Sequence, residues 1–234
     1  MTGRPEYSGS FLDKIVEGLL VLLPPAALLG PWAGSGRVFG YRILVVLLVG
    51  CAVTGWIYPI WVRRFSRAAC AIVVVAVAWA VTGVVGAMRL GPRRDLSSLM
   101  GAGLALAGAW SVARLISDRH IRRERALRDV AIGWAVAVWV GAPLAVWEIL
   151  TARHLGTYAD GAWRNHPGLY RQPATWLTNP NLYAVFLAVG SVWVGVVGVR
   201  SATRWVRIAA IATAVTGLGL LLATDSRIVY AALL

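Results

Sequence analysis

The chain has 234 residues, of which 59% are hydrophobic and 14% are charged. Soluble domains contain roughly 45–50% apolar and ~25% charged residues, so this composition excludes an ordinary soluble domain and a disordered chain. The net charge is +13, and Lys14 is the only lysine beside 22 arginines. Because the arginines lie between long apolar runs, we expect this charge to set membrane topology and not to bind nucleic acid.

Long apolar stretches recur along the whole chain, and a membrane-spanning helix needs ~20 such residues. We expect an all-α fold, a polytopic transmembrane helical bundle that fills 1–234 as a single integral membrane domain, because lipid leaves no other partner for backbone groups. An eighth span begins near Ser226 and is cut off at Leu234. The seven spans before it are expected at about 12–33, 41–62, 68–88, 96–116, 129–152, 179–199 and 206–224.

Arginine is distributed unevenly between the loops on the two sides of the expected bundle. One alternating set of loops carries 11 arginines and the other carries 8. The positive-inside rule makes the richer set cytoplasmic, with the N-terminus inside and loop 153–178 outside. We therefore expect a multi-pass protein of the cytoplasmic (plasma) membrane. Eight outer arginines oppose the usual bias, which suggests that something outside needs positive charge.

The longest loop, 153–178, carries Arg164, His166 and Arg171 among several aromatic residues. It is either a tether with interfacial aromatics or a segment that collects anions, since guanidinium groups donate paired hydrogen bonds to phosphate. The loop ends in Asn179-Pro180-Asn181, where asparagine can cap a helix and proline fits its first position. This start is either a simple cap or an anion-attracting helix N-terminus.

The next expected outer junction is Thr224-Asp225-Ser226-Arg227. Arg227 lies where hydrocarbon gives way to water, a place where charge is often functional. It either extends to the lipid headgroups or binds a substrate anion. For Asp225 we rank three roles, in this order: a salt-bridge partner for Arg227, a helix cap, and a base.

Glu148 lies near the outer end of the fifth expected span. We expect a structural ion pair between it and Arg153 or Arg171. The sequence has no Asp/Glu cluster suited to Mg²⁺, and its two cysteines are too few for a zinc site. No metal or other cofactor is expected.

Together, these motifs resemble the O-antigen ligase and polysaccharide polymerase superfamily over about 153–234. The resemblance rests on an arginine before an aromatic turn, NPN at a helix start, and T-x-S-R about 45 residues later. Ala174 stands where the family often has glycine, and this chain has one extra residue between the arginine and NPN. Family members are usually longer and carry a functional histidine in a further outer loop, so we expect a truncated member or an N-terminal fragment. The motif residues are Arg171, Ala174-Thr175-Trp176, Asn179-Pro180-Asn181 and Thr224-Asp225-Ser226-Arg227.

The resemblance implies a GT-C-like fold and metal-independent glycosyl transfer. A glycan would pass from a polyprenyl-pyrophosphate carrier to a hydroxyl of a glycan or lipid acceptor on the outer face of the membrane. Arg171 and Arg227 would hold the pyrophosphate, because arginines stabilise charge that develops in a low-dielectric site. The base would be His166 or Asp225, or would lie on the missing portion. Substrate would also meet Asn179, Asn181, Arg164 and Ser226.

Two other functions remain open. A transporter or flippase of lipid-linked sugar would share the outer arginines. Inverted repeats and helices broken near the middle of the membrane would favour this alternative. The sequence shows only Pro24-Pro25 in the first span, without a counterpart in a second half. The other alternative is a non-catalytic truncated membrane protein.

Overall fold

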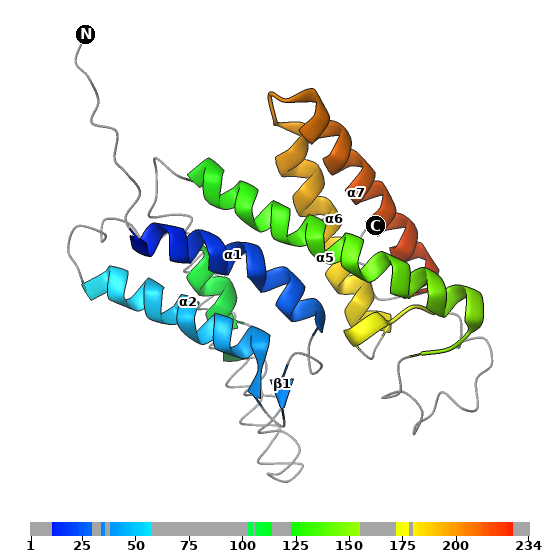
Figure 1. The fold of residues 1–234 in the computed structure, drawn as a ribbon, viewed down its shortest axis with the longest axis horizontal. Coiled ribbons are helices and arrows are strands. Elements are labelled where there is room, and N and C mark those ends of the chain that lie inside the picture. The colour runs from blue at the N-terminus through cyan, green and yellow to red at the C-terminus, as the bar shows by residue number, and fades with distance from the viewer. Residues whose placement is uncertain are drawn as a thin grey trace. The chain divides into compact units, whose positions relative to one another are not determined.

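A computed structural model describes residues 11–29, 34–35, 38–57, 103–104, 106–113, 123–154, 172–177 and 180–226. This part of the chain is helical except for its connections and one hairpin of two two-residue strands, which confirms the all-α fold class (Figure 1). The chain divides into two compact units. The first unit comprises 1–20 and 42–126, and the second comprises 21–41 and 127–234.

The first unit contains the start of α1 (Phe11–Leu29) and most of α2 (Gly40–Ile57). Residues 103–104 and 106–113 are also helical, and a Cβ on Gly108 would lie 3.1 Å from a methyl of Val45 on α2. Glu17 on α1 pairs with Arg125 at 3.5 Å. The hairpin of β1 (Gly34–Ser35) and β2 (Val38–Phe39) lies between α1 and α2 in the chain and belongs to the second unit.

Three helices of the described chain are long and apolar enough to cross a membrane, which supports a membrane protein. They are α5 (Arg123–Thr151), α6 (Pro180–Val199) and α7 (Arg204–Ala223), at the positions of the fifth, sixth and seventh expected spans. α5 begins six residues before the expected 129–152, because its first turns are charged and continue the helix beyond the apolar run. α1 and α2 occupy the first two expected positions, whereas 68–88 and 227–234 lie outside the described residues.

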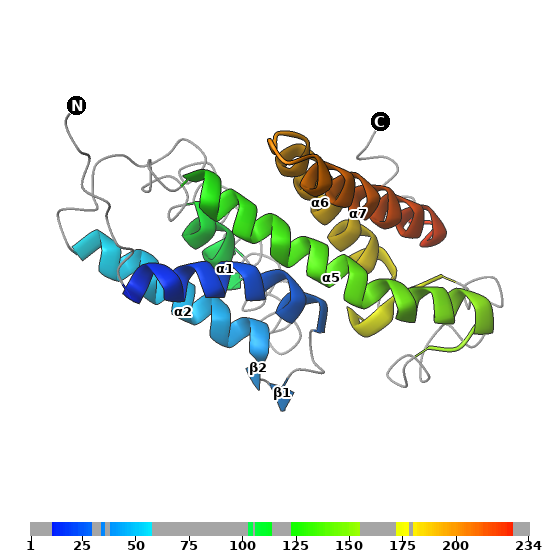
Figure 2. The ribbon, with the colours of Figure 1, turned by 45° about the horizontal axis from the view of Figure 1, so that its top comes forward.

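α6 and α7 form an antiparallel hairpin with small residues along their contact (Figures 1 and 2). Gly198 lies against Ala210 so closely that a Cβ would overlap the alanine methyl. A Cβ on Gly217 would overlap the Ser191 hydroxyl in the same way. Lipid gives apolar helices no hydrophobic reason to associate, so close backbone packing through small residues must provide the attraction.

α5 packs across this hairpin and completes the core of the second unit. The rings of Trp134 on α5 and Phe186 on α6 have their centroids 4.5 Å apart. The Trp139 Nε1–H donates to Thr213 Oγ1 on α7 at 2.9 Å. α5 therefore contacts both helices of the hairpin, and the Trp139 indole N–H finds its acceptor within the bundle.

The close approach at Gly217 makes a direct prediction about stability. Gly217→Val forces the new side chain into the Ser191 hydroxyl, so the free energy of unfolding should fall by about 1–3 kcal/mol relative to the control. The control is Gly219→Val on the same helix, where a Cβ would meet nothing within 4 Å. Thermal unfolding of both variants in detergent measures the difference. Equal melting temperatures would contradict the close packing of α6 on α7.

Candidate functional site

A buried carboxylate, Glu148, organises one end of the second unit. Its side chain is fully buried near the end of α5. Oε2 accepts hydrogen bonds from the backbone N–H groups of Ala174 at 2.8 Å and Thr175 at 2.9 Å. The carboxylate therefore attaches the segment before α6 to the end of α5, although 26 residues separate Glu148 from Ala174.

The other carboxylate oxygen faces a histidine. Beyond the last turn of α5, Ala152 has a positive φ of 55°, and its N–H donates to the Glu148 carbonyl at 2.9 Å. A left-handed residue after a helix turns the chain back on itself. This turn places His154 Nδ1 3.2 Å from Glu148 Oε1. A carboxylate oxygen thus lies beside an imidazole nitrogen at ion-pair distance.

Thr175 holds an unusual backbone conformation with a φ of 52°. Such a φ is uncommon for a β-branched residue and persists only where its surroundings enforce it. Here two successive N–H groups converge on one Glu148 oxygen, the arrangement of an anion-binding nest. The short 3₁₀ helix η6 (Thr175–Leu177) follows and packs Trp176 and Leu177 on the core. The segment that leads into α6 is thus fixed by hydrogen bonds at Ala174 and Thr175 and by packing at Trp176 and Leu177.

The start of α6 meets the end of α7 through a side-chain hydrogen bond. The Ser226 hydroxyl donates to Asn181 Oδ1 at 2.9 Å. Thr224 and Ser226 are each 1% exposed, and the Thr224 hydroxyl donates to the Leu221 carbonyl at 2.6 Å. Asp225 lies between them with a positive φ of 49° and an exposed side chain. The start of α6 and the residues that follow α7 therefore lie together at one end of the hairpin.

Of the site residues predicted from the sequence, Asn181, Asp225 and Ser226 lie in the described part of the chain. The structure brings Asn181 and Ser226 together and leaves the Asp225 carboxylate exposed. Glu148 pairs with His154, while the expected partner Arg153 has an exposed side chain. The remaining predicted residues, Arg164, His166, Arg171, Asn179 and Arg227, lie outside the described residues.

Sequence reasoning missed His154 and the backbone partners of Glu148. The signal for Glu148 was visible, because a carboxylate inside an apolar run requires a partner. Nothing in the sequence pattern shows that the chain reverses at Ala152, which is a residue without special preference for a positive φ. The histidine six positions beyond Glu148 therefore gave no indication that it returns to the carboxylate.

Tyr183, one helical turn into α6, is a second polar group at this end of the bundle. Its side chain is fully buried and close enough to Glu148 to interact electrostatically. Among the described residues its hydroxyl has no hydrogen-bond partner. Buried hydroxyls are normally bonded, so this group carries an unfavourable free energy that the surrounding packing offsets.

The chain matches no known protein family, no curated protein and no solved structure. Its chemistry must therefore be argued from its own residues. In the described ranges no three His, Cys, Asp or Glu side chains gather as a metal site. What these ranges do bring together is a buried acid with an imidazole 3.2 Å away, beside the joined ends of α6 and α7.

Glu148→Leu tests the role of the buried carboxylate. The Ala174 and Thr175 N–H groups lose their acceptor at ~1–3 kcal/mol each, so the free energy of unfolding should fall by about 2–6 kcal/mol. Amide exchange at these two residues should accelerate. Glu124→Leu, at an exposed position near the start of the same helix, should change the free energy of unfolding by less than ~0.5 kcal/mol. Unchanged exchange at Ala174 and Thr175 in Glu148→Leu would contradict this role.

Tyr183→Phe should act in the opposite direction. Removing a buried hydroxyl that lacks a partner removes its desolvation cost, so the free energy of unfolding should rise by about 1 kcal/mol. The half-buried Tyr41 gives a control, and Tyr41→Phe should leave stability within ~0.5 kcal/mol. Thermal unfolding in detergent measures both variants. A destabilised Tyr183→Phe protein would show that the hydroxyl has a bonding partner in solution.

Proposed function

We propose that the chain is an O-antigen ligase-like or polysaccharide polymerase-like membrane glycosyltransferase. The reaction moves a glycan from a polyprenyl-pyrophosphate carrier to an acceptor hydroxyl at the outer face of the cytoplasmic membrane. The proposal includes the orientation of the membrane helices, the GT-C-like fold and membership of that superfamily. It rests on the motif resemblance and on the contacts of the described residues.

The single observation that carries the proposal is the hydrogen bond from Ser226 to Asn181. These residues belong to two motifs that are 45 positions apart in the chain, and the α6–α7 hairpin brings them to the same end. A structural role for each motif alone would not require them to meet. Because Arg227 follows Ser226 directly in the sequence, the bond ties the arginine-bearing motif to the start of α6.

A second observation supports the same place for the other motif. Arg171 precedes the segment whose Ala174 and Thr175 N–H groups are bound by Glu148. That segment runs directly into Asn179-Pro180-Asn181 and α6. The described residues that follow Arg171 and those that precede Arg227 thus lie at the same end of the second unit, which supports a shared pyrophosphate.

The proposed chemistry is a displacement at the anomeric carbon of the donor sugar. The acceptor oxygen forms the new glycosidic bond, the bond from the sugar to the pyrophosphate oxygen breaks, and the acceptor proton passes to a base. Arg171 and Arg227 stabilise the charge that develops on the leaving pyrophosphate. Arg164, Asn179, Asn181 and Ser226 contact or position the substrate.

In this proposal the base is an acidic or imidazole side chain. His166 and the exposed Asp225 remain the candidates from the sequence, and the structure adds His154. Glu148 Oε1 lies 3.2 Å from His154 Nδ1, and in this proposal the carboxylate positions the ring. Glu148 is a positioning residue in this account, since its Oε2 already accepts the two backbone N–H groups.

Arg227→Lys tests the pyrophosphate contact. Lysine keeps the positive charge but loses the planar pair of donors, so glycan transfer should fall by about 10²–10³-fold, the size of losing one oxyanion donor. Arg204→Lys is the matched control, because Arg204 lies exposed at the opposite end of α7 and should be nearly neutral. The assay is glycan transfer from lipid-linked donor in membrane vesicles, with expression checked first.

Equal activity of the two variants would overturn the pyrophosphate contact and leave Arg227 as a headgroup anchor. If the vesicles move the lipid-linked donor across the membrane without forming a new glycosidic bond, the protein is a transporter or flippase. If they do neither, with the protein folded and inserted, the chain is a non-catalytic membrane protein.

A further inference from the structure

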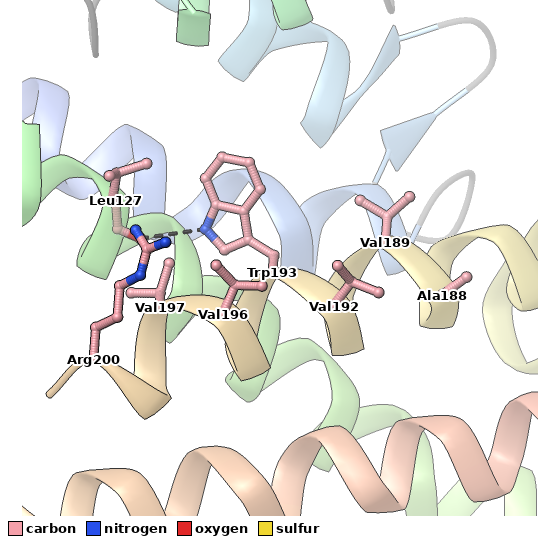
Figure 3. A pocket seen from close by; sticks show the side chains of 8 residues that line it. All are labelled: Leu127, Ala188, Val189, Val192, Trp193, Val196, Val197 and Arg200. Carbon is pink, nitrogen blue, oxygen red and sulfur yellow. Dashed lines mark hydrogen bonds between the residues drawn. The ribbon is translucent and has the colours of Figure 1, made fainter. Parts of the chain in front are cut away.

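The opposite end of α6 borders an apolar groove (Figure 3). Its walls are one continuous face of α6 from Ala188 to Arg200 and the side chain of Leu127 on α5. The volume is about 550 Å³, within the ~300–1,000 Å³ of sites that hold small molecules. Apart from Arg200 and the indole N–H of Trp193, the lining side chains have only carbon atoms beyond the backbone.

The groove is partly preformed. The Trp193 Nε1–H donates to the Leu127 carbonyl at 3.3 Å, which ties α6 to the first turns of α5 and holds the indole in the wall (Figure 3). Val192 and Val196 are 54% and 51% exposed, so no other described side chain fills the space above them. A hydrocarbon chain lying here would contact a fixed apolar surface along its length.

The one charged side chain that lines the groove, Arg200, lies at one of its ends. Arg200 directly follows α6 and is exposed, and in the described part of the chain no carboxylate pairs with it. Three further exposed arginines, Arg128, Arg204 and Arg207, belong to the starts of α5 and α7, and the described carboxylates at the start of α5 are Glu124 and Asp129. The end of the groove therefore attracts an anion, whereas the remainder takes only hydrocarbon.

The length of the groove limits the occupant. Ala188 and Arg200 are 12 positions apart, which corresponds to ~18 Å along a helix. One leaflet contributes about half of the ~30 Å hydrocarbon core, or ~15 Å. A chain that begins with its anionic head at Arg200 and follows α6 would thus end near the middle of the bilayer. Arg200 is also 19 positions from Asn181, ~29 Å along the helix, so this place is separate from the proposed catalytic end.

We propose that this groove binds an anionic glycerophospholipid of the leaflet on the Arg200 side. One acyl chain lies along Val192, Trp193 and Val196, and the headgroup phosphate accepts hydrogen bonds from the Arg200 guanidinium. The bound lipid covers an apolar face that would otherwise contact the bilayer only loosely. The inference does not depend on glycosyl transfer, and it would hold for a transporter with the same helices.

The experiment uses the purified full chain in mild detergent and titrates it separately with phosphatidylglycerol and phosphatidylcholine. Native mass spectrometry counts the lipids that remain bound. We expect one phosphatidylglycerol to be retained in preference to phosphatidylcholine. Arg200→Gln should weaken its retention about tenfold, since a hydrogen bond to a charged group is worth ~1.5–3 kcal/mol and 1.4 kcal/mol is tenfold. Arg204→Gln, an exposed arginine outside the groove, should stay within about twofold of the original protein.

A second pair of variants tests the apolar wall. Val192→Trp places an indole inside the groove and should abolish the retained lipid, whereas Val215→Trp, at a 63% exposed valine on α7, should not. A monodisperse elution profile and an unchanged melting temperature verify that each variant is folded, and Arg200→Gln tests the proposal without altering the apolar wall.

Four results would overturn the assignment. Equal loss in Arg200→Gln and Arg204→Gln would show a general attraction by surface charge. Equal retention of phosphatidylcholine would show that no anion is selected. Stronger retention of a polyprenyl phosphate than of phosphatidylglycerol would assign the groove to the carrier lipid. A lipid-free dimer that Val192→Trp dissociates would assign this face to a second copy of the chain.

Discussion

The arrangement of one end of the second unit depends on a single buried carboxylate. Glu148 is an acidic side chain that is fully buried near the end of a largely apolar helix. It is stabilised there by two backbone N–H groups and the His154 ring. A buried charge without such partners would cost far more than an apolar helix of this size can offset. Ala152 and Thr175 have positive φ angles, and the chain turns at these residues so that the partners reach the Glu148 side chain.

The features that could be predicted from the sequence are those that depend on a continuous segment of the chain. The apolar runs locate α5, α6 and α7 because span length and composition are properties of a continuous segment. The short connection between α6 and α7 likewise predicts an antiparallel pair, and hence that Asn181 and Ser226 lie together. The start of α5 was placed too late, since helix formation continues through Glu124 and Arg128 where the hydropathy signal has already ended.

The rest could not be predicted because it depends on reversals of the chain at residues with no special propensity. Alanine and threonine seldom adopt a positive φ, so Ala152 and Thr175 gave no reason to expect a turn. His154 therefore looked like any loop residue, and Arg153 looked like the natural partner of Glu148. In the structure His154 is the partner of Glu148, because the turn after α5 directs the histidine inward. The longer Arg153 side chain remains exposed.

The register of the α6–α7 hairpin connects packing to the proposed site. Gly198 contacts Ala210, and Ser191 contacts Gly217; the second pair is seven residues earlier on α6 and seven residues later on α7. Asn181, bonded to Ser226, is a further ten residues earlier on α6, and Ser226 is nine residues after Gly217. The two helices therefore keep nearly one register over their full length. Small residues in the middle allow the backbones to approach, and this approach decides which side chains meet at the end, about fifteen ångströms further along. A site built on helix ends is in this way positioned by contacts remote from it, which favours precise geometry over the mobility of a loop.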